Sequence, residues 1–320
     1  MKKHKIRALQ AAALLLSAGI TMTAGGALAN PTPWDTTYGY TENRSGTTWY
    51  VYTRKPWRAI TGTSGNHIQI GDAGHTVNLT KAVYGGLSGA LNGCEVILYS
   101  GSSTNGILVG GLSEENISNS TVTLQSRARV TGTQTTIAGA WGASSAELSH
   151  NAASAEGSTI CVHDLAGAKN DSGSVLYNTL TVKSSRITDT ILTGGLTQNA
   201  GESSHNSVSL YDVTVTVSNT SKVYQAAGGS GASGNVTENS LTVDSSDVDI
   251  ALYGGVNNGS GNISGNKVAV KDSKVTETVS HGTNVKNMVI AGGYSESGDA
   301  TENLASVDHT VIKETLINPD

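Results

Sequence analysis

The sequence predicts an all-β fold, a parallel β-helix (β-solenoid) of roughly nine rungs with an aromatic-rich N-terminal cap. Three observations predict it: Gly-Gly pairs recur at fairly even intervals, Asn-led runs of alternating apolar and polar residues recur at the same pace, and the repeat contains no helical apolar stripe. The composition agrees, because 39 Gly and only 14% charged residues depart from ordinary globular and ordinary disordered chains. The alternative is another all-β arrangement, such as a sandwich.

Residues 1-29 are expected to form an export signal that is removed from the mature chain. The segment begins with the basic stretch MKKHKIR, continues with the apolar stretch ALQAAALLLSAGI and ends at the small residues Ala27, Leu28 and Ala29. The apolar stretch is too short to span a bilayer, and no later stretch approaches the roughly 20 apolar residues that a transmembrane helix needs. We therefore expect an exported chain with no membrane span of its own.

Removal of the signal leaves a mildly acidic chain. The whole sequence has 20 Lys and Arg against 25 Asp and Glu, and the signal contains four of the basic residues, so the net charge becomes 20 − 4 − 25 = −9. Nucleic acid normally requires a basic face, so we expect no nucleic acid partner. An acidic, Gly- and Ser/Thr-rich exported chain is typical of the outside of a bacterial cell.

Residues 30-65 precede the repeats and are expected to cover the N-terminal end of the stack, because an open rung invites edge-to-edge aggregation. This short segment is rich in aromatic residues, namely Trp34, Trp49, Trp57, Tyr38, Tyr40, Tyr50 and Tyr52. We favour a hydrophobic cap, with a sugar-stacking site as the alternative. The C-terminal end, after Asn303, has no comparable segment.

The Gly-Gly pairs begin at Gly85, Gly110, Gly194, Gly228, Gly254 and Gly292. Two gaps are 25 and 26 residues long (110 − 85 and 254 − 228), and the wide gap of 84 residues divides into three steps of 28, with Gly139 and Gly167 near the expected places. The longer steps, of 34 and 38 residues (228 − 194 and 292 − 254), are interpreted as loop insertions. We expect each Gly-Gly to mark a sharp corner, where a positive φ or close backbone approach excludes a Cβ.

Each unit is expected to hold at least two short strands separated by tight turns. One strand follows a recurrent Asn, at Asn178, Asn206, Asn239, Asn266 and Asn303, and the second ends at the Gly-Gly. The Asn side chains are expected to form an amide ladder from rung to rung. Rungs lie about 4.8 Å apart, so 252 ÷ 28 = 9 rungs over residues 66-317 make a rod about 43 Å long, which we expect to be right-handed. The repeat domain is taken as residues 66-320.

These Asn-led, Gly-Gly-punctuated repeats behind a signal peptide resemble the passenger domains of bacterial autotransporters, in the style of pertactin-like and filamentous-haemagglutinin-like β-helical adhesins. The resemblance covers about residues 66-317 and implies export from a Gram-negative bacterium to the cell surface or the medium, with periplasmic retention as the alternative. Members of this family usually continue into an aromatic-rich outer-membrane β-barrel that ends in Phe or Trp. This chain has no Phe, its last Trp is Trp141 and its last residue is Asp320, so we expect it to lack the barrel.

We expect no catalytic, cofactor-binding or metal-binding residues. Polysaccharide lyases and glycosidases also use β-helices, and they need clustered carboxylates on an exposed sheet. The best such cluster is Asp247 and Asp249, both expected to face outward about 6.6 Å apart, and a carbohydrate-active enzyme that uses them is the alternative function. The flanking rungs are expected to place Asp212 and Thr214 on one side and Lys274 and Thr276 on the other, which suits a solvated charge ladder.

The other candidate residues are given structural roles. His150 and His205 each precede a repeat Asn and are expected at equivalent corners, two rungs apart. His163 and Asp164 are adjacent, but neighbouring strand residues face opposite sides. The stretch GGSGASGN is similar to a calcium-binding repeat but has Ser233 where the Asp ligand is required.

The two cysteines, Cys94 and Cys161, are expected to be free and mostly buried. They lie 67 residues apart (161 − 94), more than two rungs, so their Cα atoms are expected about 10 Å apart or more, beyond the reach of a disulfide. Cys94 alternates with Val96 and Leu98, which places it on the inward face.

These observations together predict a non-enzymatic, adhesin-like rod. Its outward Ser/Thr/Asn ladders and its loops, especially residues 218-235 and 279-299, are expected to bind host glycans or surface proteins through many weak contacts. The sequence leaves the ligand and the oligomeric state open.

Overall fold

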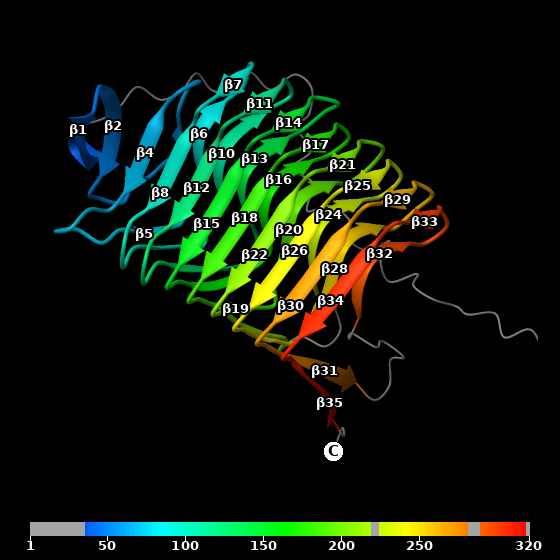
Figure 1. Cartoon of the computed structure of the whole chain (residues 1–320). Helices are drawn as coiled ribbons and strands as arrows, with labels where there is room; N and C mark the ends of the chain where they lie inside the picture. The colour runs from blue at the N-terminus through cyan, green and yellow to red at the C-terminus, as the bar shows by residue number, and fades with distance from the viewer. Residues whose placement is uncertain (1–35, 219–223, 281–288, 318–320) are drawn as a thin grey trace, which may run out of the picture.

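A computed structural model describes residues 36-218, 224-280 and 289-317 of the chain. In this part the fold is an all-β parallel solenoid made of three long sheets, of 11, 16 and 8 strands (Figure 1). We name them sheets A, B and C. A single turn of 3-10 helix at Thr36–Tyr38 precedes the first strand.

Sheet A contains β1 (Gly39–Arg44), β2 (Thr47–Tyr52), β4 (His67–Ile70), β8 (Glu95–Leu98), β12 (Thr121–Leu124), β15 (Ala152–Glu156), β18 (Thr179–Lys183), β22 (Ser207–Tyr211), β26 (Ser240–Asp244), β30 (Lys267–Lys271) and β34 (Leu304–Asp308). Sheet C contains β7 (Leu91–Asn92), β11 (Ile117–Ser118), β14 (Leu148–Ser149), β17 (Val175–Leu176), β21 (Ser203–Ser204), β25 (Val236–Thr237), β29 (Ile263–Ser264) and β33 (Ala300–Thr301).

Sheet B contains β3 (Ile60–Thr61), β5 (Asn78–Leu79), β6 (Val83–Leu87), β9 (Ser103–Thr104), β10 (Leu108–Ser113), β13 (Arg129–Gly142), β16 (Thr159–Asn170), β19 (Arg186–Thr188), β20 (Ile191–Thr197), β23 (Thr214–Thr216), β24 (Gln225–Gly231), β27 (Asp247–Val248), β28 (Ala251–Asn257), β31 (Lys274–Ser280), β32 (Ile290–Ser295) and β35 (Val311–Ile317). Each rung therefore passes through sheet A, then through two stretches of sheet B, and then through sheet C.

Between residues 66 and 317, sheet A contributes nine strands in parallel register, from β4 to β34, so the predicted rung number is confirmed. The predicted cap boundary differs slightly from the structure. Strands β2 and β3 lie within residues 30-65 and already pair in parallel with β4 and β6. The cap proper is β1, which pairs antiparallel with β2 and ends the parallel stack.

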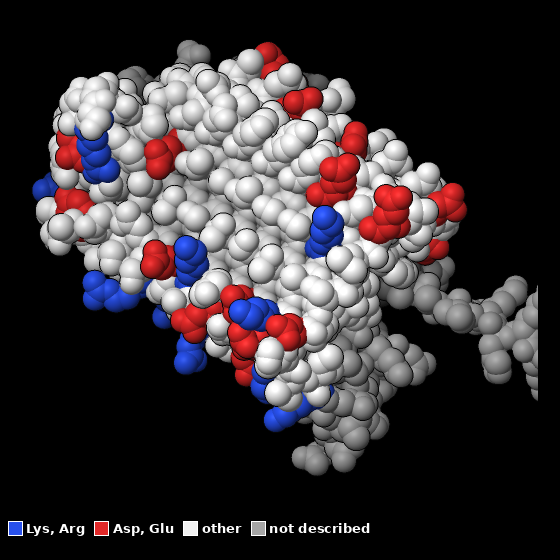
Figure 2. Space-filling view, in the orientation of Figure 1, with Lys and Arg blue, Asp and Glu red and all other residues white. Residues whose placement is uncertain are grey.

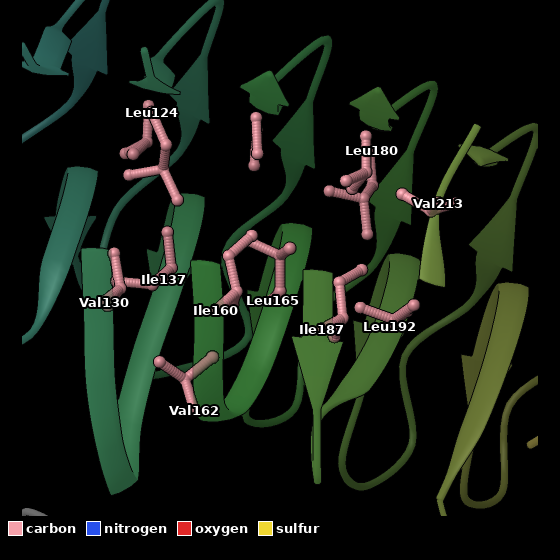
Figure 3. Packing of buried hydrophobic residues seen from close by; sticks show 14 of the residues in the cluster. Leu124, Val130, Ile137, Ile160, Val162, Leu165, Leu180, Ile187, Leu192 and Val213 are labelled. Carbon is pink, nitrogen blue, oxygen red and sulfur yellow. The ribbon is translucent and has the colours of Figure 1, made fainter. Parts of the chain in front are cut away.

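The main core is one continuous column of mostly aliphatic side chains enclosed by the sheets, and two smaller clusters lie outside it. Leu180, Leu241 and Val268 share this column and are each 1% exposed. Leu241 lies two rungs after Leu180, and Val268 lies one rung after Leu241. Figure 3 shows the middle of the column, where Ile137, Ile160 and Leu165 from sheet B meet side chains of sheet A such as Leu124 and Leu180. Each rung is too small to bury its aliphatic side chains alone, so the rungs stack and share one interior column.

The Asn residues form the predicted ladder. The Nδ2 atoms of Asn151, Asn178, Asn206 and Asn239 each donate to the Oδ1 of the ladder Asn in the next rung at 3.0 Å, and Asn266 does the same to Asn303 at 2.9 Å. The backbone N–H of each of these donors reaches the same oxygen. Buried amides are satisfied only if every rung supplies one, which fixes the register.

The Gly-Gly pairs do not mark corners, and this part of the prediction is wrong. They lie inside strands of sheet B, with φ outside the left-handed region, and the first glycines stack on one another from rung to rung. A Cβ built on Gly228 would lie 2.5 Å from the carbonyl oxygen of Gly254 and 2.5 Å from the backbone nitrogen of Ser240. Close backbone approach between sheets A and B is therefore the reason for glycine. Gly139 and Gly167 occupy this same column, as predicted.

The corners instead use single left-handed residues, most of which are not glycine. The position before each ladder Asn has a positive φ, for example 57° at His150 and 55° at His205. A second such position lies between sheets A and B, for example at Asp212 with a φ of 54°.

The two predicted insertions lie between consecutive stretches of sheet B. They separate β23 from β24 and β31 from β32, and residues 219-223 and 281-288 lie outside the described residues. Much of the predicted binding loops, 218-235 and 279-299, is therefore strand, because β24 and β32 fall within these ranges. Among the described residues, the last rung has no rung beyond it to cover its inward side chains. Val307 is 45% exposed, whereas its register partner one rung earlier, Val270, is 1% exposed.

Candidate functional site

The outward face of sheet A is a two-dimensional array of hydroxyl groups. In β12, β18, β22 and β26, the inward residue is aliphatic and the two residues that flank it are Ser or Thr. The array consists of Thr121, Thr123, Ser154, Thr179, Thr181, Ser207, Ser209, Ser240 and Thr242. The rows repeat about every 4.8 Å between rungs, and the two columns lie about 6.6 Å apart along each strand. All of these side chains are half-buried or exposed.

This array is uncharged, and the charges surround it. Figure 2 shows a broad area without Asp, Glu, Lys or Arg over the middle of sheet A. The end of each strand forms a rim at which charge alternates, at Glu156, Lys183, Asp244 and Lys271, with the half-exposed Tyr211 among them. A neutral hydroxyl face suits ligands that are themselves neutral and rich in hydroxyls, because neither side then has to desolvate a charge.

The array is held rigidly from beneath. The Asn ladder runs along the edge where each strand of sheet A begins. Hydrogen bonds between rungs also fix the register at the opposite edge of sheet A. There the backbone N–H of Ser158 donates to Ser185 Oγ at 3.0 Å, and the backbone N–H of Ser246 donates to Ser273 Oγ at 3.1 Å. The Asn ladder and these two Ser–Ser links, which Val213 separates, therefore fix the spacing of the hydroxyls before any ligand arrives, which lowers the entropy cost of binding.

Asp247 lies on sheet B, away from the hydroxyl array. Its register partners are Thr214 and Lys274, as predicted, and Lys274 Nζ contacts its two carboxylate oxygens at 3.0 and 2.8 Å. Asp249 is half-buried and donates its backbone N–H to Val215. The geometry at Asp247 is that of a rung-to-rung ion pair at the surface.

The expectation that His163 and Asp164 face opposite sides is wrong. His163 Nδ1 lies 3.0 Å from Asp164 Oδ1, and Lys169 Nζ lies 2.6 Å from the other carboxylate oxygen. The register between β13 and β16 shifts at this point, where the chain bends between the two stretches of sheet B, so regular alternation is lost. Burial alone raises the pKa of Asp164, but the hydrogen bond from His163 and the charge of Lys169 outweigh it and hold the pKa at about 2.

His150 and His205 occupy equivalent corners two rungs apart, as predicted. Between them lies Tyr177, which was not predicted to matter and whose ring stacks on both imidazoles with centroid distances of 5.1 and 4.7 Å. Glu238, the next residue in the same column, was not predicted either, and its Oε2 lies 2.7 Å from His205 Nε2. The signal was present in the sequence, because all four residues directly precede a ladder Asn.

The two cysteines are free, as predicted. Cys94 is fully buried and packs with Leu91, Ile117 and other aliphatic residues at the end of the core near sheet C. Cys161 is only half-buried, because it points outward from β16, so the prediction that both thiols are mostly buried holds for Cys94 alone. Burial raises the pKa of both thiols.

The aromatic residues of the cap divide into two groups. Trp49 is 8% exposed and packs with Val51 and Ile97, which supports the predicted hydrophobic cap. Trp57 is 62% exposed, with the Arg58 guanidinium 3.7 Å from its ring centroid. Trp34 lies outside the described residues.

Within residues 36-218, 224-280 and 289-317, no group of three or more His, Cys, Asp or Glu side chains is placed to hold a metal ion. Ser233, in the stretch that is similar to a calcium-binding repeat, donates its backbone N–H to Asn199. In the same described residues, no helix is long and apolar enough to cross a membrane. Comparison of the chain with protein-family models, curated proteins and solved structures found no match.

Proposed function

We propose that this chain is an exported, adhesin-like β-helical module that binds neutral glycans through the hydroxyl face of sheet A, with surface proteins as the alternative ligands. The proposal includes the passenger-like role that the resemblance implies, on the surface of a Gram-negative bacterium or in its medium. The observation that carries it is the combination of a neutral, periodic hydroxyl array with the Asn ladder and the Ser–Ser links at the opposite edge, which keep its spacing fixed.

Each hydroxyl contact with a sugar is weak, because a hydrogen bond to a ligand replaces one to water. The face offers rows of Ser and Thr on successive rungs, so an extended glycan can meet several hydroxyls at once. Summed weak contacts of this kind give avidity without a deep pocket. No chemical step is assigned to this face, and the ion pair of Asp247 with Lys274 gives no reason to prefer the carbohydrate-active enzyme.

A pair of matched variants tests the binding role. The double variant Thr179→Lys with Ser207→Lys places two charges on the array, at the column where Lys267 stands naturally two rungs beyond Ser207. The control Thr214→Lys places a charge on sheet B, one rung from Asp247 and in the column of Lys274. On an array of neutral glycans, we expect wild-type and control proteins to bind alike and the double variant to lose binding. Equal binding by all three proteins would remove sheet A as the binding face.

Export is tested separately. Fractionation of cells that express the whole chain, followed by protease treatment of intact cells, distinguishes surface display, release and periplasmic retention. We expect the protein to be found in the medium or to be cleaved on intact cells. Recovery of uncleaved protein, with its first residues intact, from the cytoplasm alone would contradict the proposal.

A further inference from the structure

A chain of hydrogen bonds links three side chains at the corner between sheets C and A. Ser204 Oγ lies 2.6 Å from His205 Nδ1, and His205 Nε2 lies 2.7 Å from Glu238 Oε2 in the next rung. Both ring nitrogens of His205 are thus engaged by side chains of opposite kind, a hydroxyl on one side and a carboxylate on the other. A hydroxyl, an imidazole and a carboxylate in this order are the groups that nucleophilic acyl transfer requires.

The partners fix the protonation pattern of the imidazole. An ionised carboxylate only accepts hydrogen bonds, so the hydrogen of neutral His205 lies on Nε2 and points to Glu238. Nδ1 therefore carries the lone pair, and it faces the Ser204 hydroxyl. Thr237 Oγ1 donates to Ser204 Oγ at 3.0 Å, which leaves the hydroxyl hydrogen of Ser204 free to point at His205.

The fold holds these groups in place. Ser204 is the last residue of β21 and is 4% exposed, and His205 has a φ of 55° in the turn that follows. The imidazole of His205 is fixed in orientation because it stacks on Tyr177, one rung before it, at 4.7 Å. The side chains of His205 and Glu238 are 38% and 62% exposed, so solvent reaches the imidazole and the carboxylate. Ser204 itself is 4% exposed, and an acyl donor must therefore approach its Oγ past these two side chains.

A comparable Ser-His pair in an earlier rung serves as an internal control for Ser204 and His205. Ser149 and His150 occupy the same two positions two rungs earlier, and His150 stacks on the other face of Tyr177 with a φ of 57°. In the rung that follows Ser149 and His150, the equivalents of Thr237 and Glu238 are Leu176 and Tyr177. This pair has a Ser and a His at the same two positions but no carboxylate at the place of Glu238, so His150 lacks the partner that orients the imidazole of His205.

We propose that Ser204 is an activated nucleophile that accepts acyl groups from small esters, with His205 as its general base and Glu238 as the positioning residue. Ser204 Oγ forms a bond to the ester carbonyl carbon while its proton passes to His205 Nδ1. The bond from that carbon to the alcohol oxygen then breaks, and the alcohol leaves with the proton from His205. The products are an acyl ester of Ser204 and a free alcohol, and water releases the acyl group as the acid in a second step that uses the same base.

The surroundings select the charge of the ester. Residues 197-206 and 230-239, which form this corner, contain Glu202 and Glu238 and no Lys or Arg. Glu202 Oε1 lies 3.4 Å from Thr237 Oγ1, so both carboxylates are close to Ser204. A neutral or cationic acyl donor is therefore favoured over an anionic one. This activity is independent of glycan binding by sheet A and goes beyond it.

The test uses the whole mature protein with p-nitrophenyl acetate and a neutral fluorophosphonate, and peptide mass spectrometry locates the modified residue. We expect Ser204 to be modified about 10²-fold faster than Ser149, and we expect His205→Gln to lower the Ser204 rate by about 10²-fold, the usual contribution of a general base. Ser149→Ala is the matched control and is expected to leave the rate unchanged.

The role of Glu238 is tested by Glu238→Gln, an exposed change of similar size that leaves folding intact. We expect a rate at least about 10-fold lower, together with a change in the ¹⁵N chemical shifts of the His205 ring that reports loss of the Nε2–H tautomer. Labelling of Ser204 no faster than Ser149, or an unchanged rate in Glu238→Gln, would overturn the proposal.

Discussion

Asn178 and Asn206 are joined by two hydrogen bonds to one oxygen. The backbone N–H of Asn178 donates to Asn206 Oδ1 at 2.9 Å, and Asn178 Nδ2 donates to the same atom at 3.0 Å. Both residues are at most 1% exposed, so water cannot replace either bond. The ladder thus joins backbone and side chain in every step, and its middle members serve two rungs at once.

We therefore predict that Asn206→Ala lowers the free energy of unfolding by about 3 kcal/mol, because two buried donors of Asn178 lose their acceptor. The control is Asn199→Ala, since Asn199 makes an exposed bond to Asp171, and we expect a change below about 0.5 kcal/mol there. Urea titration followed by circular dichroism measures both. Similar losses of unfolding free energy in the two variants would show that the buried Asn ladder stabilises the fold no more than an exposed hydrogen bond does.

The column of glycines predicts a second stability effect. Gly228→Ala would place a Cβ 2.5 Å from three backbone atoms of neighbouring strands, so we expect a loss of about 3 kcal/mol or failure to fold. Gly74→Ala is the matched control, because the nearest atom to its Cβ would be 3.6 Å away. Thermal unfolding compares them. A Gly228→Ala protein as stable as the wild type would show that sheets A and B do not approach closely at this point.

Asp164 predicts a dependence of stability on acid. Its pKa is about 2 in the folded chain against a usual value near 3.8, so its ionised form stabilises the fold at neutral pH. That contribution, roughly 2 kcal/mol, is present above about pH 4 and is lost as the pH falls toward 2.

The measurement is the free energy of unfolding of the wild type and of Asp164→Asn at pH 6 and at pH 2.5. We expect the wild type to lose more stability than the variant across this interval. Equal losses would mean that Asp164 is not held ionised by His163 and Lys169.

Asp247 and Asp249 give a prediction about chemistry. Because Asp247 is paired with Lys274, we expect the purified protein to release no reducing or unsaturated ends from a panel of plant and bacterial polysaccharides. The variants Asp247→Ala and Asp249→Ala are the controls. Release by the wild type that both substitutions abolish would favour the carbohydrate-active enzyme over the adhesin-like module.

The cysteines predict a difference in reactivity. In native protein at pH 8, we expect iodoacetamide to modify the half-buried Cys161 slowly and to leave the fully buried Cys94 unmodified. After unfolding in urea, both thiols are expected to react at similar rates, as mass spectrometry of the peptides would show. Rapid native labelling of Cys94 would mean that the core near sheet C opens to solvent.

The architecture was accessible from the sequence because a solenoid repeats one local solution. The alternation around Leu180 and Leu241 marks strands that bury one face, and the Asn before each strand marks the rung boundary. The rung number followed from the spacing alone, since every rung meets the same constraint.

The role of the glycines was harder to predict. A glycine at a corner and a glycine pressed between two sheets give the same sequence signal, and only the packing of sheet A against sheet B distinguishes them. The local rule of alternation also failed at His163 and Asp164, where the strand bends and brings both side chains together.

What the sequence by itself determined is the period: which residues face inward, how many rungs stack and where the amide ladder runs. What only the tertiary structure decided is which side chains from different rungs come within bonding distance, as Ser204, His205 and Glu238 do. The physical reason is that hydrophobic alternation is a property of each strand alone, whereas a contact between rungs depends on turns whose left-handed geometry sets where each side chain points.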